Sequence, residues 1–203
     1  MTYALYVTHP QVVQDPAIPV PRWGLSELGR RRAERFANHV LMRAVIRIVS
    51  SRETKALELA AILAALCKAP VESGENFGEN DRSSTGFVPR ERFEALADSF
   101  FAHPDTSVEG WETARSAQGR VVGAVEAVLH EHDASRPIAF AGHGAVGTLL
   151  KCHLGKRDIA RSEDQSRHGD PGGGNVFVFR LSDMALLTGW TAMEALPETI
   201  PGL

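Results

Sequence analysis

Two histidines, His9 and His143, each follow directly on a short apolar run, although they are far apart in the chain. The runs span residues 3–8 and 137–142, and turn-forming residues bound both of them. Runs of this length are typical of buried parallel strands. In open α/β sheets, ligands bind just beyond the carboxyl ends of the strands. We therefore expect both imidazoles to face one crevice, an arrangement that suits the transfer of a phosphoryl group to an imidazole nitrogen.

The elements that must position these histidines alternate between strand and helix. Further strands are expected at residues 44–49, 70–73, 175–181 and 185–190. Helical patterns cover residues 26–40, with Ser26 as the N-cap, and residues 53–67, 111–130 and the segment after residue 143. This alternation predicts a mostly parallel central sheet covered by helices on both faces, a three-layer α/β sandwich. At 203 residues the chain is expected to form one domain, residues 1–203.

Residues 75–110 are the least regular part of the chain. Five phenylalanines lie in this segment, so its composition can support a packed structure. They are Phe77, Phe87, Phe93, Phe100 and Phe101. We interpret the segment as an insertion that folds over the site and determines the substrate.

Charge and cysteine content limit the classes of partner and the compartment. A net charge of −3 argues against a nucleic-acid partner, because such proteins normally carry a basic face. No apolar stretch is long enough to span a bilayer, and no secretory leader is expected. Two cysteines, Cys67 and Cys152, lie in apolar helical stretches and do not suggest a disulfide scaffold. These features predict a cytoplasmic protein without a membrane partner.

Four motifs, in this order, resemble those of the histidine phosphatase superfamily, the phosphoglycerate-mutase-like fold. They are Thr8-His9-Pro10, the segment from Ser50 to Ala56, Glu79, and Gly142-His143-Gly144. Family members usually have Arg-His-Gly at the first place and Ser-Ser, a spacer and Arg-Ala at the second. A Glu or Asp in the insertion and a late His-Gly complete the pattern. The resemblance covers nearly the whole chain and implies the same three-layer fold.

The resemblance also implies roles for individual residues. His9 would attack phosphorus, His143 would donate hydrogen bonds to the phosphoryl oxygens, and Glu79 would protonate the leaving oxygen. The helices that follow Ser51 and Gly144 could present backbone N–H groups to the phosphate.

This chain departs from the family pattern at three positions. Thr8 replaces the first arginine, Pro10 replaces the glycine, and Lys55 replaces the second arginine. Thr8 offers one neutral hydroxyl, and Lys55 keeps a charge but not the bidentate geometry of arginine. We therefore predict that another cation helps Thr8 and Lys55 to hold the phosphate, with Arg82 preferred and Arg52 next.

The sequence thus predicts a phosphatase that uses neither metal nor cofactor and acts on a small phosphorylated metabolite. The main alternative is a catalytically degenerate member that binds a phosphorylated or anionic ligand, and a mutase-type phosphotransferase is less favoured. Residues 142–147 also match a dinucleotide-binding glycine pattern, although close helix–sheet packing explains these glycines better. The tripeptide at residues 167–169 is expected in a loop. A homodimer is compatible with the family.

Overall fold

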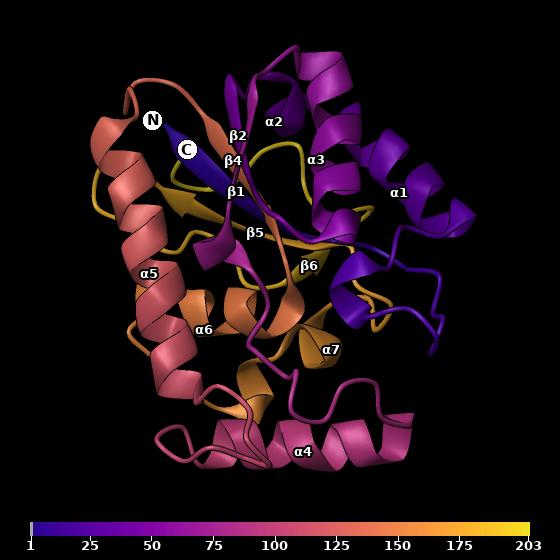
Figure 1. Cartoon of the computed structure of the whole chain (residues 1–203). Helices are drawn as coiled ribbons and strands as arrows, with labels where there is room; N and C mark the ends of the chain where they lie inside the picture. Colours follow the sequence, from indigo (N-terminus) through magenta and orange to yellow (C-terminus); the bar gives the residue numbers. More distant parts are fainter. Residues whose placement is uncertain (1) are drawn as a thin grey trace.

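The computed structural model describes residues 2–203, and its centre is one six-stranded sheet with the order β3-β2-β4-β1-β5-β6 (Figure 1). The strands are β1 (Tyr3–Thr8), β2 (Arg47–Ser51), β3 (Val71–Gly74), β4 (Ile138–Gly142), β5 (Asn175–Arg180) and β6 (Thr191–Ala192). Strands β3, β2, β4 and β1 run parallel, whereas β5 and β6 pair antiparallel at one edge. The sheet is therefore mixed but mostly parallel, as predicted.

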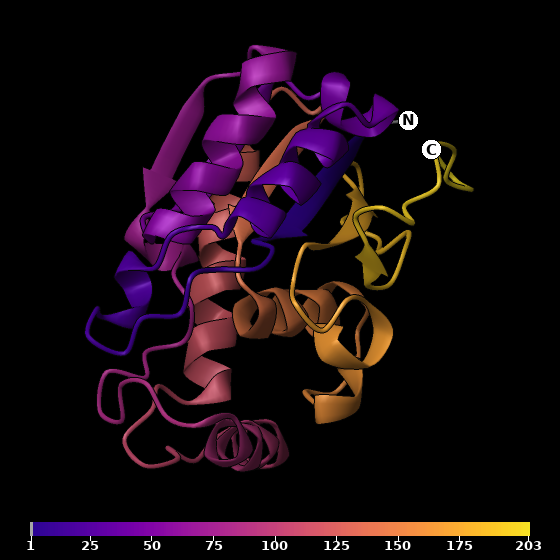
Figure 2. The same ribbon diagram turned by 90° about the vertical axis from the view of Figure 1, so that its right-hand side faces the viewer.

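Helices cover both faces of this sheet. The α-helices are α1 (Glu27–Ala37), α2 (Val40–Arg43), α3 (Thr54–Cys67), α4 (Arg90–Ala102), α5 (Ala114–Glu131), α6 (Gly144–Leu154) and α7 (Gln165–His168). Short 3-10 helices are η1 (Val20–Arg22), η2 (Glu75–Phe77) and η3 (Arg161–Glu163). Helices α1 to α3 pack on one face, and α5 and α6 pack on the other (Figures 1 and 2). The predicted three-layer α/β sandwich is confirmed.

Strand β1 is buried on both faces, which explains why its sequence is apolar at nearly every position. Its side chains alternate between the two cores, with Leu5 and Val7 in the cluster beneath α1 and α3. Ala4 and Tyr6 lie in the cluster beneath α5 and α6. A strand that is buried on both faces has no polar side to present, so the alternation of a half-exposed strand is absent.

The register between β1 and β4 brings the two histidines together. Thr8 pairs with Gly142, so the next residue of each strand is a histidine at the same edge of the sheet. The His9 amide donates a hydrogen bond to the Gly142 carbonyl at 3.0 Å, which continues the pairing past the end of β1. The expectation of one shared edge is met.

The insertion contains a regular helix that the sequence analysis did not assign. Helix α4 buries Leu96, Ala97, Phe100 and Phe101, a spacing that places all four on one face of a helix. In both views α4 lies at the bottom of the molecule, beyond the lower end of α5 (Figures 1 and 2). The apolar residues of α4 therefore repeat with a helical period in the sequence, but the irregular segments on both sides made this pattern hard to recognise.

Three other expectations need correction. Strand β2 runs over Arg47–Ser51, later than the expected residues 44–49, because residues 47–50 form its ladder with β4. The expected strand at residues 185–190 is reduced to one bridge from Leu186 to Phe179, and β6 forms only at Thr191–Ala192. Residues 167 and 168 belong to helix α7, which Asp164 caps through the amide of Ser166, and not to a loop. By contrast, Ser26 caps α1 as predicted.

Candidate active site

The imidazole rings of His9 and His143 lie edge to face at the ends of β1 and β4. Their ring centroids are 5.3 Å apart, and the ring planes are inclined by 69°. Two strands that are adjacent in the sheet, but distant in the chain, thus present two imidazoles to the same place.

His9 is held so that one specific ring nitrogen is available. Its Nδ1 lies 3.0 Å from the carbonyl oxygen of Pro10. A carbonyl can only accept, so the neutral ring carries its proton on Nδ1 and has its lone pair on Nε2. Burial, together with the positive charges of His143 and Lys55, lowers the pKa of His9 to about 3. The ring is therefore neutral near pH 7, with Nε2 as a potential nucleophile.

His143 is completely buried, and neither of its ring nitrogens has a hydrogen-bond partner among residues 2–203. The Oε1 atom of Glu53 lies 3.3 Å from Nε2 but is poorly aligned for a hydrogen bond. Burial lowers the pKa of His143 to about 4, although Glu53 opposes the change. The Tyr6 hydroxyl accepts a hydrogen bond from the His143 amide at 3.2 Å and thereby fixes the backbone. A buried polar group without a partner is uncommon, so both ring nitrogens remain available to a ligand.

Glu53 is the main residue that the sequence analysis missed. It is the N-cap residue of α3, and its carboxylate accepts a hydrogen bond from the Glu79 amide at 2.9 Å. The same carboxylate forms an ion pair with Lys55. Burial alone would raise the pKa of Glu53, but His143, Lys55 and the Glu79 amide together hold it well below its usual range. A glutamate two residues before a lysine at a helix start was the available signal.

Lys55 is engaged by other groups of the chain. Its side chain is 5% exposed, and Nζ donates a hydrogen bond to the carbonyl oxygen of Val20 at 3.0 Å in addition to its ion pair with Glu53. The lysine therefore lies in the site region, but its charge is partly neutralised by a neighbouring carboxylate.

Thr8 and Ser51 are both fully buried and bonded within the fold. The Thr8 hydroxyl donates to the Oε1 atom of Gln165 at 2.8 Å and accepts from the amide of Asn175 at 2.9 Å. The Ser51 hydroxyl accepts from the amide of Glu53 at 3.1 Å. These contacts give both hydroxyls a role in positioning the chain.

Glu79 lies against the start of helix α6. Its carboxylate accepts hydrogen bonds from the amides of Ala145 at 3.2 Å and Val146 at 3.0 Å. Gly144 is the first residue of that helix, and a Cβ atom on it would lie 2.1 Å from the side chain of Gln165. The first-turn amides of α6 are thus partly satisfied by a carboxylate of the insertion.

The two arginines singled out from the sequence lie in different surroundings. Arg82 stacks on aromatic rings, with its guanidinium carbon 5.1 Å from the centre of Phe93 and 5.6 Å from that of Trp111. Arg52 instead points to solvent and pairs with Glu75 at 2.7 Å. Of these two arginines, Arg82 lines the neighbouring cleft and Arg52 does not.

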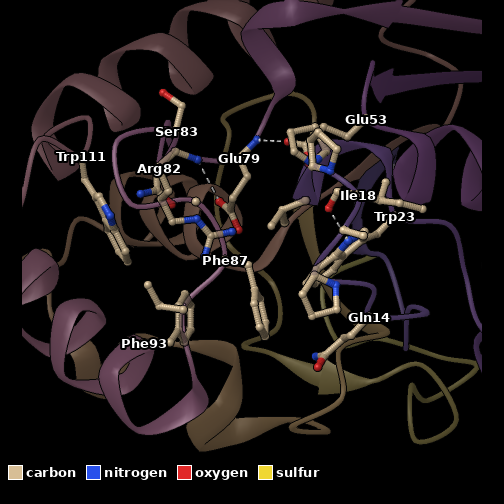
Figure 3. Close-up of a pocket in the computed structure, with 18 of the residues that line it drawn as sticks. Gln14, Ile18, Trp23, Glu53, Glu79, Arg82, Ser83, Phe87, Phe93 and Trp111 are labelled. Carbon is tan, nitrogen blue, oxygen red and sulfur yellow. Dashed lines mark hydrogen bonds between the residues drawn. The ribbon is translucent and has the colours of Figure 1, made fainter.

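A cleft of about 880 Å³ adjoins this group of residues (Figure 3). Glu53 and Glu79 are its two carboxylates, while His9 and His143 lie outside its lining. The other lining residues are Gln14, Pro16, Ala17, Ile18, Pro19, Val20, Pro21, Trp23, Asn80, Arg82, Ser83, Gly86, Phe87, Val88, Arg90, Phe93 and Trp111. The segment before α1 therefore forms one wall, and the insertion forms the other.

Two kinds of structural feature are absent from residues 2–203. No cluster of three or more His, Cys, Asp or Glu side chains is arranged to hold a metal ion in this part of the chain. Over the same residues, no helix has the length and apolar character needed to cross a membrane.

Comparison with known proteins adds a family match and a set of similar folds. A family model described as the histidine phosphatase superfamily, branch 1, matches residues 19–186, which include His143 but not His9. None of the curated proteins matches the chain in sequence.

Solved structures share the fold at low sequence identity. The mycobacterial glucosyl-3-phosphoglycerate phosphatase in complex with inorganic phosphate has a TM-score of 0.76 at 18% identity, covering 96% of this chain and 99% of that one. A phosphoserine phosphatase mutant from Entamoeba histolytica, in complex with phosphoserine, has a TM-score of 0.75 at 15% identity, covering 97% and 100%. YhfR of Bacillus stearothermophilus has a TM-score of 0.74 at 16% identity, covering 98% and 99%.

Proposed function

Because this chain belongs to the histidine phosphatase superfamily, branch 1, we propose that it hydrolyses phosphate monoesters through a phosphohistidine at His9. The observation that carries the proposal is the state of the His9 ring. Its Nδ1 faces the Pro10 carbonyl, and its pKa lies well below neutrality, so Nε2 offers a lone pair near pH 7.

The reaction has two displacements. The Nε2 atom of His9 attacks phosphorus, the N–P bond forms, and the bond between phosphorus and the ester oxygen breaks. The leaving oxygen takes a proton from Glu79, one of the two carboxyl groups that line the cleft. Water then attacks phosphorus and gives a proton to the Glu79 carboxylate, the N–P bond breaks, and inorganic phosphate leaves.

Fewer side chains stabilise the negative charge of the phosphoryl group here than in phosphate sites that are rich in arginine. The ring nitrogens of His143 donate hydrogen bonds to the phosphoryl oxygens when they carry protons. The protonated ring offers two such donors, and each neutral tautomer offers one. Arg82 supplies a guanidinium at the wall of the cleft. Lys55 contributes when its contact with Glu53 loosens. Positioning and such cationic groups dominate the catalysis of phosphoryl transfer.

The structural neighbours support a phosphate-type ligand. Two of them are phosphatases solved with inorganic phosphate or phosphoserine, although an identity of 15–18% carries only the fold.

A second candidate function is the binding of a phosphorylated ligand without turnover. The hydroxyl of Thr8 is bonded to Gln165 and Asn175, and Lys55 is paired with Glu53. These contacts occupy two groups that would otherwise bind phosphate, which favours a weakened or inactive site.

The test is hydrolysis of p-nitrophenyl phosphate by the wild type and by His9→Ala, from pH 5 to 8, with and without a chelator. We expect turnover that the chelator does not change and that His9→Ala lowers by at least about a thousandfold. The matched control is His103→Ala, which removes a histidine from the exposed end of α4. Rapid quenching should trap an acid-labile phosphoenzyme in the wild type only.

Turnover that persists in His9→Ala would reject the phosphohistidine mechanism. Absence of turnover in the wild type, together with an increase in melting temperature on adding phosphate or vanadate, would favour the binding function. If neither turnover nor a thermal shift is seen, the phosphate site itself is rejected.

A further inference from the structure

We propose that the cleft beside the histidine pair binds an aromatic group, so that the substrate is the phosphate monoester of an aromatic alcohol. The ester part of this inference rests on the proposed function, whereas the aromatic site is argued from the cleft alone.

One wall of the cleft is apolar and rigid. Residues 16–21 contribute three prolines and Ile18, and Trp23 follows them. Trp23 meets Phe87 of the insertion edge to face, with ring centroids 5.5 Å apart (Figure 3). Ile18 and Phe87 remain 41% and 43% exposed, so apolar side chains face water at the cleft. An apolar ligand that covered them would gain the free energy of removing that surface from water.

The opposite wall combines flat rings with a positive charge. The ring centroids of Phe93 and Trp111 are 6.1 Å apart, and the Arg82 guanidinium stacks on both (Figure 3). Within residues 2–203, no carboxylate lies at ion-pairing distance from Arg82. A cation that is oriented by ring faces and has no anionic partner is complementary to an anionic, aromatic ligand.

Asn80 gives an independent sign of a ligand. This side chain lines the cleft, is 4% exposed, and its Nδ2 has no hydrogen-bond partner in the described chain. A buried amide without a partner is unfavourable, and a ligand oxygen would satisfy it. Asn80 directly follows Glu79, so a ligand oxygen bonded to it lies next to the proposed proton donor.

The cleft adjoins the histidine pair through two carboxylates. Glu53 and Glu79 line it, and the same Glu53 approaches the Nε2 atom of His143. The proline and ring surfaces of the walls offer no hydrogen-bond partner to the hydroxyl groups of a polyhydroxylated alcohol. A flat aromatic body instead matches both walls, and a volume of about 880 Å³ lies within the usual range for ligand pockets.

The experiment has one readout for the aromatic site and one for the ester. The first readout is the binding of 2-naphthol, which carries no phosphate. Binding is measured by the quenching of tryptophan fluorescence and by calorimetry. The second is the ratio of kcat/KM for 2-naphthyl phosphate to that for phosphoserine. Both are measured in the wild type, in Phe87→Ala, and in Leu66→Ala as a control that removes an exposed apolar side chain of α3 outside the cleft.

We expect 2-naphthol to bind to the wild type, and Phe87→Ala to weaken binding by roughly fivefold to tenfold, the effect of losing one ring contact. The kcat/KM ratio should fall by a similar factor in Phe87→Ala and stay unchanged in Leu66→Ala. Absence of 2-naphthol binding, or equal binding in the wild type and Phe87→Ala, overturns the proposal. Binding of 2-naphthol that depends on Phe87, without hydrolysis of any ester, upholds the aromatic site and rejects the proposed function.

Discussion

At the scale of single residues, Glu53 gives this site its unusual charge balance. Its carboxylate approaches His143 and pairs with Lys55, two groups that the family resemblance assigns to the phosphate. A carboxylate and a phosphate are both anions, so they compete for the same donors and repel each other at close range. Because Glu53 has a pKa below its usual range, the carboxylate is ionised at neutral pH. The residue therefore opposes the binding of phosphate.

The substitution Glu53→Gln tests this competition, because it removes the charge and keeps the size of the side chain. We expect inorganic phosphate and vanadate to bind about tenfold more tightly, since one repulsive charge is removed and Lys55 is released. The measurement is the inhibition constant of each anion, or its thermal shift if turnover is slow.

The control for this substitution is Glu75→Gln, whose carboxylate pairs with Arg52 at the surface. Unchanged or weaker anion binding in Glu53→Gln would show that the carboxylate supports the anion site indirectly, through Lys55 or the Glu79 amide.

At the scale of elements, helix α6 packs very close to strand β1 beside the histidine pair. Gly147 allows this approach, because a Cβ atom there would lie 2.4 Å from the Tyr6 ring and 2.9 Å from the Trp190 ring. Gly142 likewise abuts the Tyr6 hydroxyl, where a Cβ atom would lie at 2.3 Å. These packing distances account for the glycine pattern of residues 142–147 without a dinucleotide.

Two Gly→Ala substitutions distinguish the effect of this close packing on stability from the effect of helix propensity. Gly147→Ala should lower the free energy of unfolding by about 1–3 kcal/mol, the usual cost of overpacking a core. Gly119→Ala, in the exposed middle of α5 with open space around its Cα, should raise it by up to about 1 kcal/mol. Urea unfolding of both variants gives the two values. A neutral or stabilising Gly147→Ala would show that α6 can move away from β1 without cost.

At the scale of the whole molecule, burial of two neutral histidines links stability to pH. Both pKa values fall from 6.5 in the unfolded chain, to about 3 for His9 and about 4 for His143. At pH values between the unfolded pKa of 6.5 and the folded pKa of each histidine, the unfolded chain binds more protons than the folded chain. The free energy of unfolding is therefore greatest above pH 6.5 and decreases as the pH falls toward 4.

Thermal or urea unfolding between pH 7 and 5 measures this dependence. We expect the wild type to lose stability as the pH is lowered, and His143→Gln to show a smaller loss over the same range. His103→Gln, which alters an exposed histidine, should keep the dependence of the wild type. Equal slopes in the wild type and His143→Gln would mean that His143 does not contribute to the acid sensitivity.

The amino-acid pattern alone was enough to predict the layers of the fold and the edge at which the histidines meet. Apolar runs of strand length reveal doubly buried strands, and parallel strands present their carboxyl ends at one edge. The placement of His9 and His143 follows from these two local rules. The boundaries of β2 and the weak terminal pairing at β6 could not be predicted in this way, because strand ends depend on the partners available.

The composition of the site was decided by contacts between segments that are distant in the chain. Thr8 is bonded to Gln165 and Asn175, and Arg82 lies on the rings of Phe93 and Trp111. Such contacts leave no regular spacing of residues in the sequence, because they depend on how the loops are arranged at the edge of the sheet. Local spacing therefore identified the elements and the histidines, whereas the charges and rings that surround them were established only when tertiary packing brought these segments together.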